Sequence, residues 1–130
     1  MSKFRFKEDP WILDELEQLR KKNNQLYRRV CKNLALLEKR GMQAIKDRFR
    51  RCKPHISVLE KTEGGTEIYY VKTPPNGDNI YRTFFYMVRS REFGDYPKYL
   101  DAFQKKTQKI PVHIKDRIVN RYYQRERQGD

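Results

Sequence analysis

Cysteine and histidine are scarce in this chain, with two of each among 130 residues. Cys31 and Cys52 have neither a CxxC neighbour nor a histidine at metal-ligand spacing, so the sequence predicts free thiols and no zinc site. The two histidines, His55 and His113, are equally isolated. We therefore expect any chemistry of this protein to proceed without a bound metal or other cofactor.

Long hydrophobic runs are also missing. The longest is FFYMV at residues 84–88, whereas a helix that crosses a bilayer needs about 20 apolar residues. The N-terminal sequence MSKFRFKEDP carries charges where a secretory signal needs an apolar stretch. These two features predict a cytoplasmic protein that does not associate with a membrane.

Acidic residues are few relative to basic ones. Seventeen Asp and Glu stand against thirty Lys and Arg, which gives a formal net charge of +13. A field of this sign gathers polyanions such as nucleic acid, although it identifies a class of partner and not a chemistry. Nine tyrosines and seven phenylalanines supply enough large apolar side chains for a core, and the length suits a single domain over residues 1–130.

The first third of the chain predicts two antiparallel helices or one broken helix. Apolar residues recur at helical spacing over 12–19 and again over 26–37, on either side of the polar run RKKNN. Asp9 is expected to cap the first helix and Gly41 to end the second. Before them, the alternation of charged and aromatic residues from Lys3 to Lys7 predicts a short strand.

The remainder of the chain predicts an antiparallel sheet followed by a helix. The basic segment 44–55 is weakly periodic and is expected to be a loop or a short helical turn. A helix is expected from Pro111 to about Arg125. The fold class is therefore α+β, with an N-terminal helical hairpin packed on a curved sheet of about four strands and a C-terminal helix. The expected strands are HISVLE, TEIYYVKT, NIYRTFFYMV and PKYLDAF, with the turn PPNGD between the second and third.

Four basic parts of the chain can converge near the central hairpin. If position 72 pairs with position 82, Lys72 and Arg82 emerge on one sheet face, whereas a slip of one residue would separate them. The segment FQKKTQKIP would lie at one end of an adjoining strand. The C-terminal helix carries a stripe of arginines beside its apolar stripe of Ile114, Ile118 and Tyr122. The basic residues concerned are Lys72, Arg82, Lys105, Lys106, Lys109, Arg117, Arg121 and Arg125.

Aromatic residues accompany these cations. Recognition of single-stranded RNA uses cations for the phosphates and aromatic planes for the unpaired bases. A simpler interpretation stays open, because lysine runs are commonly solvated loops and tyrosines in a half-buried sheet commonly serve packing. The tyrosines near the hairpin are Tyr69, Tyr70, Tyr81 and Tyr86, and the predicted RNA-binding residues are Tyr70, Tyr86, Arg117, Arg121 and Arg125.

The same residues could promote RNA cleavage without a metal. When a 2′-hydroxyl attacks its own phosphate, negative charge builds on the phosphoryl oxygens, and fixed cations stabilise that charge more than they stabilise the ground state. Proton transfer is open among Tyr81, Tyr86, His55 and an unpaired lysine with a lowered pKa. The predicted catalytic residues are Lys72, Arg82, Lys105, Lys106, Lys109 and Tyr81.

The segment NIYRTFFYMV, followed by YLDAFQKKTQKIP and a basic helix, resembles the HigB-like, phage-derived branch of the RelE/ParE toxin superfamily. That branch typically carries KKTQKTP or a similar motif between a strand and a C-terminal helix. The resemblance covers roughly residues 65–125. Arg82 matches the arginine of the family's third-strand motif, and Lys105, Lys106 and Lys109 match its lysine motif.

The resemblance implies a RelE-like microbial ribonuclease fold and the toxin of a type II toxin–antitoxin pair. Such toxins usually cut mRNA at the ribosomal decoding site, so the implied partners are mRNA on the ribosome and a helix-turn-helix antitoxin. Two departures from the family pattern stand out. The family's tyrosine–glutamate–leucine–arginine strand is replaced by Tyr69, Tyr70, Val71 and Lys72, and Asp101 stands near the place of the family's histidine.

Two other functions are open at this point. A protein of the same fold could inhibit a protein target such as gyrase and leave transcripts whole. A basic phage protein could also bind RNA or DNA without cutting it, and its binding would then weaken steeply with salt.

Overall fold

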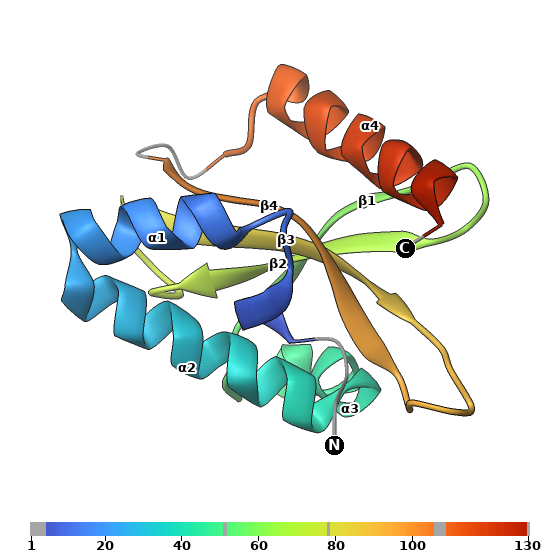
Figure 1. Cartoon of the computed structure of the whole chain (residues 1–130), viewed down its shortest axis with the longest axis horizontal. Helices are drawn as coiled ribbons and strands as arrows, with labels where there is room; N and C mark the ends of the chain where they lie inside the picture. Colours follow the sequence, from blue (N-terminus) through green and yellow to red (C-terminus); the bar gives the residue numbers. More distant parts are fainter. Residues whose placement is uncertain (1–4, 51, 78, 106–108, 130) are drawn as a thin grey trace.

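The computed structural model of the chain describes residues 5–50, 52–77, 79–105 and 109–129. It is an α+β fold with four antiparallel strands in one sheet and a C-terminal helix (Figure 1). The elements in chain order are η1 (Phe6–Glu8), α1 (Leu13–Lys22), α2 (Asn24–Arg40), α3 (Met42–Lys46), η2 (Arg48–Arg50), β1 (Ile56–Lys61), β2 (Glu67–Thr73), β3 (Ile80–Val88), β4 (Tyr96–Lys105) and α4 (Val112–Gln128).

The sheet is a simple meander in the order β1-β2-β3-β4. All four predicted strands are confirmed, and the connection between β2 and β3 falls at the predicted PPNGD, of which Pro74 to Gly77 are among the described residues. The pairing of β3 with β4 slips by one residue between Phe84 and Phe85, and such a bulge increases the twist of a sheet. Figure 1 shows the strongly twisted sheet between the α1–α2 hairpin on one side and α4 on the other.

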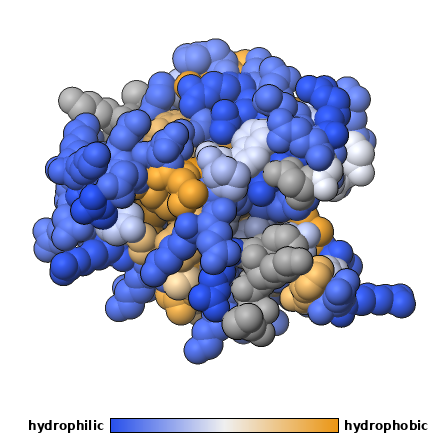
Figure 2. Space-filling view, in the orientation of Figure 1, coloured by the Kyte–Doolittle hydropathy of each residue, from blue (hydrophilic) through white to orange (hydrophobic). Residues whose placement is uncertain are grey.

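Each face of the sheet has its own hydrophobic cluster. On one face, α1, α2 and η1 cover side chains that include Val71, Tyr81 and Phe85. On the other face, α4 covers a cluster that includes Phe84 and Leu100. Both faces are therefore packed, because successive strand residues point to opposite sides of the sheet. Hydrophilic residues cover most of the molecular face drawn in Figure 2, with small hydrophobic areas between them.

The two N-terminal helices confirm the predicted helical hairpin. The buried face of α2 is the predicted one, and the break between the helices falls at Asn23, whose side chain accepts a hydrogen bond from the Leu26 amide (3.1 Å). At the end of α2, Gly41 has φ +56°, and its amide donates to the Leu37 carbonyl. Glycine suits this position because other residues rarely adopt positive φ.

The predictions for the first nine residues are wrong where the structure describes them. Phe6 and Lys7 lie in a 3₁₀ turn and not in a strand. The first two residues of the predicted strand, Lys3 and Phe4, lie outside the described residues. Asp9 does not cap α1, which begins at Leu13. Its carboxylate instead accepts a hydrogen bond from the Trp11 amide (3.0 Å), ahead of the helix, and pairs with the buried Arg125 of α4.

The other two helical predictions hold with small changes. The basic segment 44–55 contains the end of α3 and the short η2, as the prediction of a short helical turn allowed. The C-terminal helix begins one residue later than predicted and runs to Gln128, with Ile114, Ile118 and Tyr122 buried on the sheet. In the ranges that the structure describes, we find no helix with the length and apolarity needed to span a membrane.

Candidate nucleic-acid interface

Four side chains form a row across one face of the sheet. Lys72 pairs with Arg82, which is the one of the two registers considered that puts both side chains on one face. Arg82 in turn pairs with Phe103 of β4. On the other side, the Lys72 amide donates to the His55 carbonyl (2.8 Å), which continues the β1–β2 ladder by one pair beyond Ile56 and Val71. Residues that pair directly across an antiparallel sheet share a face. The row therefore runs from His55 through Lys72 and Arg82 to Phe103.

A hollow of about 260 Å³ opens beside this row. Its walls come from β2, from β3 and from the connection between them, which brings Pro75, Asn76 and Gly77 over the end of the sheet. The volume is at the small end of ligand sites, so it suits a phosphodiester group better than a large cofactor. The complete lining is Tyr70, Lys72, Pro75, Asn76, Gly77, Ile80 and Arg82.

Arg82 is the most enclosed member of the row. Only 1% of the residue is exposed, and its guanidinium carbon lies 5.7 Å from the centroid of the Tyr70 ring. A cation held over an aromatic face in this way is fixed in position. Arg82 and Lys72 both line the hollow, and Lys72 is half-buried where Arg82 is almost fully enclosed.

His55 joins the row as a titratable group. Its pKa is lowered from the usual histidine value, first by burial and then by the positive charges of Lys72 and Lys53. The imidazole is therefore mainly neutral near pH 7 and can accept a proton. The sequence alone offers His55 only as one of several candidates for proton transfer. Its pairing with Lys72 becomes visible only in the strand register.

The structure places two of the three predicted lysines of the loop. Lys105 is the last residue of β4 and pairs with Ile80, a residue that lines the hollow. Lys105 thus lies on the same sheet face as Arg82 and Phe103. Lys109 is exposed just before α4. The prediction for Lys106 falls outside the described residues.

Two tyrosines were predicted for stacking or proton transfer, and neither is exposed on the sheet face that carries Arg82. Tyr81 lies on the opposite side of the sheet, under the α1–α2 hairpin, and is 3% exposed. Burial raises the pKa of its phenol, and among the described residues its hydroxyl has no hydrogen-bond partner. These predictions for Tyr81 are wrong because the alternation of a strand sends neighbours to opposite faces.

Tyr86 is on the correct face but is covered by α4. It is 2% exposed, its ring packs edge-on against Tyr122 at 4.7 Å, and its hydroxyl donates to Glu126 (2.5 Å). Burial, with the neighbouring carboxylate, raises the pKa of this phenol. Tyr86 therefore cannot stack on a base, and Tyr70 is the one predicted RNA-binding tyrosine that lines the hollow.

The arginine stripe of α4 is engaged in ion pairs. Arg125 is buried and pairs with Asp9, so the prediction that it lies on an exposed basic edge is wrong. Arg117 and Arg121 lie 2.5 and 3.9 Å from Asp101, which is buried in β4. Arg121 also donates to the Leu100 carbonyl (2.5 Å). These contacts fasten α4 to the sheet, and Asp101 offsets part of the charge that would attract RNA.

Comparisons of the chain with protein-family models, with curated proteins and with solved structures found no match. In residues 5–50, 52–77, 79–105 and 109–129, no cluster of three or more His, Cys, Asp or Glu side chains could hold a metal ion.

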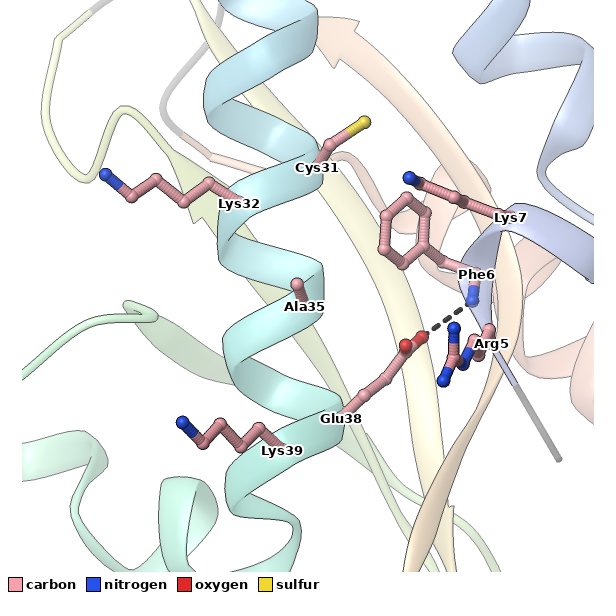
Figure 3. A pocket seen from close by; sticks show the side chains of 8 residues that line it. All are labelled: Arg5, Phe6, Lys7, Cys31, Lys32, Ala35, Glu38 and Lys39. Atoms are coloured by element: carbon pink, nitrogen blue, oxygen red, sulfur yellow. Dashed lines mark hydrogen bonds between the residues drawn. The ribbon is translucent and has the colours of Figure 1, made fainter. Parts of the chain in front are cut away.

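A larger hollow, of about 440 Å³, lies between α2 and η1. Figure 3 shows Glu38 reaching from α2 toward the Phe6 amide, while Lys32 and Lys39 extend to the other side. Glu38 accepts hydrogen bonds from the Phe6 amide (2.6 Å) and from the Tyr99 hydroxyl (2.7 Å). Its carboxylate thus ties the N-terminal turn to β4, and this hollow shares no lining residue with the one beside Arg82.

We expect the replacement Glu38→Gln to change how stability depends on pH. Burial raises the pKa of Glu38 despite these two hydrogen bonds, so the folded protein holds this proton at pH values where the unfolded chain has lost it. The wild type should therefore lose stability relative to Glu38→Gln as the pH rises from the ordinary glutamate range through the raised pKa. Urea denaturation of both proteins at pH 4 and pH 7 measures this, and a difference that is the same at both pH values would contradict it.

Proposed function

We propose that this protein is an endoribonuclease that cuts single-stranded RNA without a metal. One observation carries the proposal: His55, Lys72 and Arg82 lie in one row beside a hollow that fits a phosphodiester. A neutral imidazole can act as a base at neutral pH, and the two cations can stabilise a developing phosphoryl charge. The overall charge of +13 adds attraction for a polyanionic substrate.

In the proposed reaction, the His55 imidazole removes the proton from a 2′-hydroxyl. The freed oxygen attacks the adjacent phosphorus, and Lys72 and Arg82 stabilise the negative charge on the phosphoryl oxygens. The bond to the 5′-oxygen breaks, and that oxygen takes a proton from a lysine ammonium on the same face. The products are a 2′,3′-cyclic phosphate and a 5′-hydroxyl end. Tyr70, in the wall of the hollow, is available to contact the base or sugar.

The proposal also includes a fold family and a biological role. The lysine motif and the order of helical hairpin, meander and C-terminal helix support a RelE-like ribonuclease fold and a toxin of the HigB-like branch. We infer that the substrate is mRNA on the ribosome, that the protein acts in the cytoplasm to stop translation, and that a helix-turn-helix antitoxin restrains it.

Expression in a bacterial host tests the proposal. The wild type should arrest growth and leave new 5′ ends in cellular mRNA, which primer extension maps. Lys72→Ala combined with Lys105→Ala should relieve the arrest and remove these ends, because two phosphate-binding cations are lost from the site. The matched control, Lys32→Ala with Lys39→Ala, removes the same charge from α2 on the other side of the sheet and should behave as the wild type.

Other outcomes of the expression experiment would contradict the proposal. Arrest with whole transcripts would indicate a protein target such as gyrase. Arrest and cleavage that survive the loss of Lys72 and Lys105 would mean that the active site lies elsewhere.

A second function, RNA binding without cleavage, is favoured by a specific observation. Arg82 is almost wholly buried, and both Tyr81 and Tyr86 are too enclosed to carry protons to a substrate. Such a protein would be tolerated on expression, and it would bind an oligonucleotide equally well with or without 2′-hydroxyls, with strong dependence on salt. Incubation of the purified protein with labelled RNA, alone and with ribosomes, separates binding from cleavage.

A further inference from the structure

Phe49 of η2 is the most exposed large hydrophobic residue among those that the structure describes. It is 80% exposed, while the next, Val112, is 71% exposed. Single exposed apolar residues are common on proteins. Phe49 differs because it lies in a basic segment of the chain and because its ring contacts the Arg48 guanidinium.

Arg48 lies within cation–π distance of two aromatic rings. Its guanidinium carbon is 4.3 Å from the centroid of the Phe49 ring and 5.9 Å from that of Tyr69 in β2. Arg48 also donates to the Ile45 carbonyl (2.7 Å). The guanidinium thus contacts both rings, and the high exposure of Phe49 leaves most of that residue open to solvent.

Other cations are close to Phe49 in the sequence. Lys46, Arg50 and Lys53 are exposed in the same segment, and the only carboxylate among its described residues is Asp47, which already contacts Arg40 and Arg50. We call the group of Lys46, Arg48, Phe49, Arg50 and Lys53 the Phe49 patch.

We propose that the Phe49 patch is a second binding site for single-stranded RNA. An unpaired base stacks on the exposed ring of Phe49, while Arg50 and Lys53 contact the flanking phosphates. An exposed aromatic plane beside cations is the arrangement that proteins use for unpaired bases. A bilayer would instead favour several apolar side chains together, and Phe49 is the only large hydrophobic residue exposed in this segment.

The patch and the hollow beside Arg82 are associated with opposite faces of the sheet. Tyr69 packs in the cluster under α1 and α2, whereas Lys72, three residues later in β2, is on the other face. Lys53 stands two residues before His55, just ahead of β1, which is an edge strand. A strand bound at both places would therefore pass around the β1 edge, and the patch would hold a nucleotide outside the cleavage position. This inference rests on the proposed function for the identity of the polyanion.

Binding of a non-cleavable oligonucleotide tests the patch. The probe is a fluorescein-labelled 12-mer of 2′-O-methyl RNA of mixed sequence, and its affinity for the full chain is measured by fluorescence anisotropy at fixed salt. Phe49→Leu keeps the apolar side chain without the ring and should weaken binding about tenfold or more, since base stacking on an aromatic has an effect of this size. Phe49→Trp should bind as the wild type, and Val112→Ala is the matched control for an exposed apolar residue that should have no effect.

Two outcomes would overturn the inference: Phe49→Leu binds the oligonucleotide as tightly as the wild type, or Phe49 is needed for phosphatidylserine vesicles and not for the oligonucleotide. Unchanged binding by Phe49→Leu leaves the proposed function intact if cleavage persists. Conversely, binding that depends on Phe49 in a protein without any cleavage would support the patch and reject the endoribonuclease.

Discussion

Replacing His55 by alanine is expected to lower the rate of RNA cleavage by about 100- to 10,000-fold, the usual contribution of a positioned general base. The reason is that the backbone of His55 pairs with that of Lys72, a residue that lines the hollow proposed to hold the phosphate. Single-turnover cleavage of a labelled RNA on purified ribosomes measures the rate. His113→Ala removes the other histidine, which is exposed on α4, and should leave the rate unchanged.

The pH dependence of cleavage gives a sharper check on His55. A base must be deprotonated to act, and the pKa of His55 is lowered by burial and by the charges of Lys72 and Lys53. The acidic limb of the rate profile should therefore lie below the usual histidine range. Lys72→Gln removes one of the nearby charges, so the pKa of His55 should rise and the limb should move to higher pH. An NMR titration follows the same imidazole without substrate.

Either of two results would reject this role for His55. Cleavage by His55→Ala at the wild-type rate would show that another group takes the proton. An acidic limb that does not move in Lys72→Gln, although the His55 signal titrates at higher pH, would show that the limb belongs to a different residue.

Replacing Asp9 by alanine is expected to destabilise the fold by about 3–5 kcal/mol, the usual effect of removing one partner from a buried ion pair. Both side chains of the Asp9–Arg125 pair are only 8% exposed, and one guanidinium nitrogen of Arg125 lies 3.0 and 2.9 Å from the two Asp9 oxygens. The same nitrogen also contacts the Tyr99 carbonyl. The substitution leaves Arg125 buried without this carboxylate. Urea denaturation gives the loss in free energy of unfolding.

An exposed ion pair supplies the control for Asp9. Arg20 and Glu17 of α1 are 2.5 Å apart, a shorter distance than that of the buried pair, but both side chains are about half exposed. Water screens such a pair, so Glu17→Ala should change stability little. The double variant Asp9→Leu, Arg125→Met should recover much of the loss, because apolar side chains can replace a buried pair. Equal small effects of Asp9→Ala and Glu17→Ala would contradict this account.

Local patterns in the sequence were sufficient for most of the fold. The spacing of apolar residues in α2, the turn composition between β2 and β3 and the runs of aromatic and β-branched residues each predicted the element that forms. The register of the hairpin was open, since a slip of one residue costs little in local propensity. Cross-strand packing favours the observed register, because it pairs Tyr70 with Phe84 and Tyr69 with Phe85, and both pairs of rings are in contact.

The candidate site was predicted in part. Lys72, Arg82 and Lys105 share a sheet face as the favourable register implied, and Tyr70 lines the hollow beside them. The prediction for Tyr81 failed because strand alternation places it on the face opposite Arg82. Those for Tyr86 and Arg125 failed for a common reason. Each is a polar side chain that is buried by, and paired with, a residue more than 20 positions away in the sequence. The residues next to it in the sequence do not indicate that partner.

The sequence by itself determined the strongly basic charge, the secondary-structure elements and their order, because charge and periodicity are properties of the residues alone. Only the tertiary structure decided which cations line the hollow and which pair within the fold. Arg125 became a buried partner of Asp9, and His55 entered the site through its pairing with Lys72. The physical reason is that burial and the neighbouring charge, which set the role of an ionisable group, arise only when distant segments pack together.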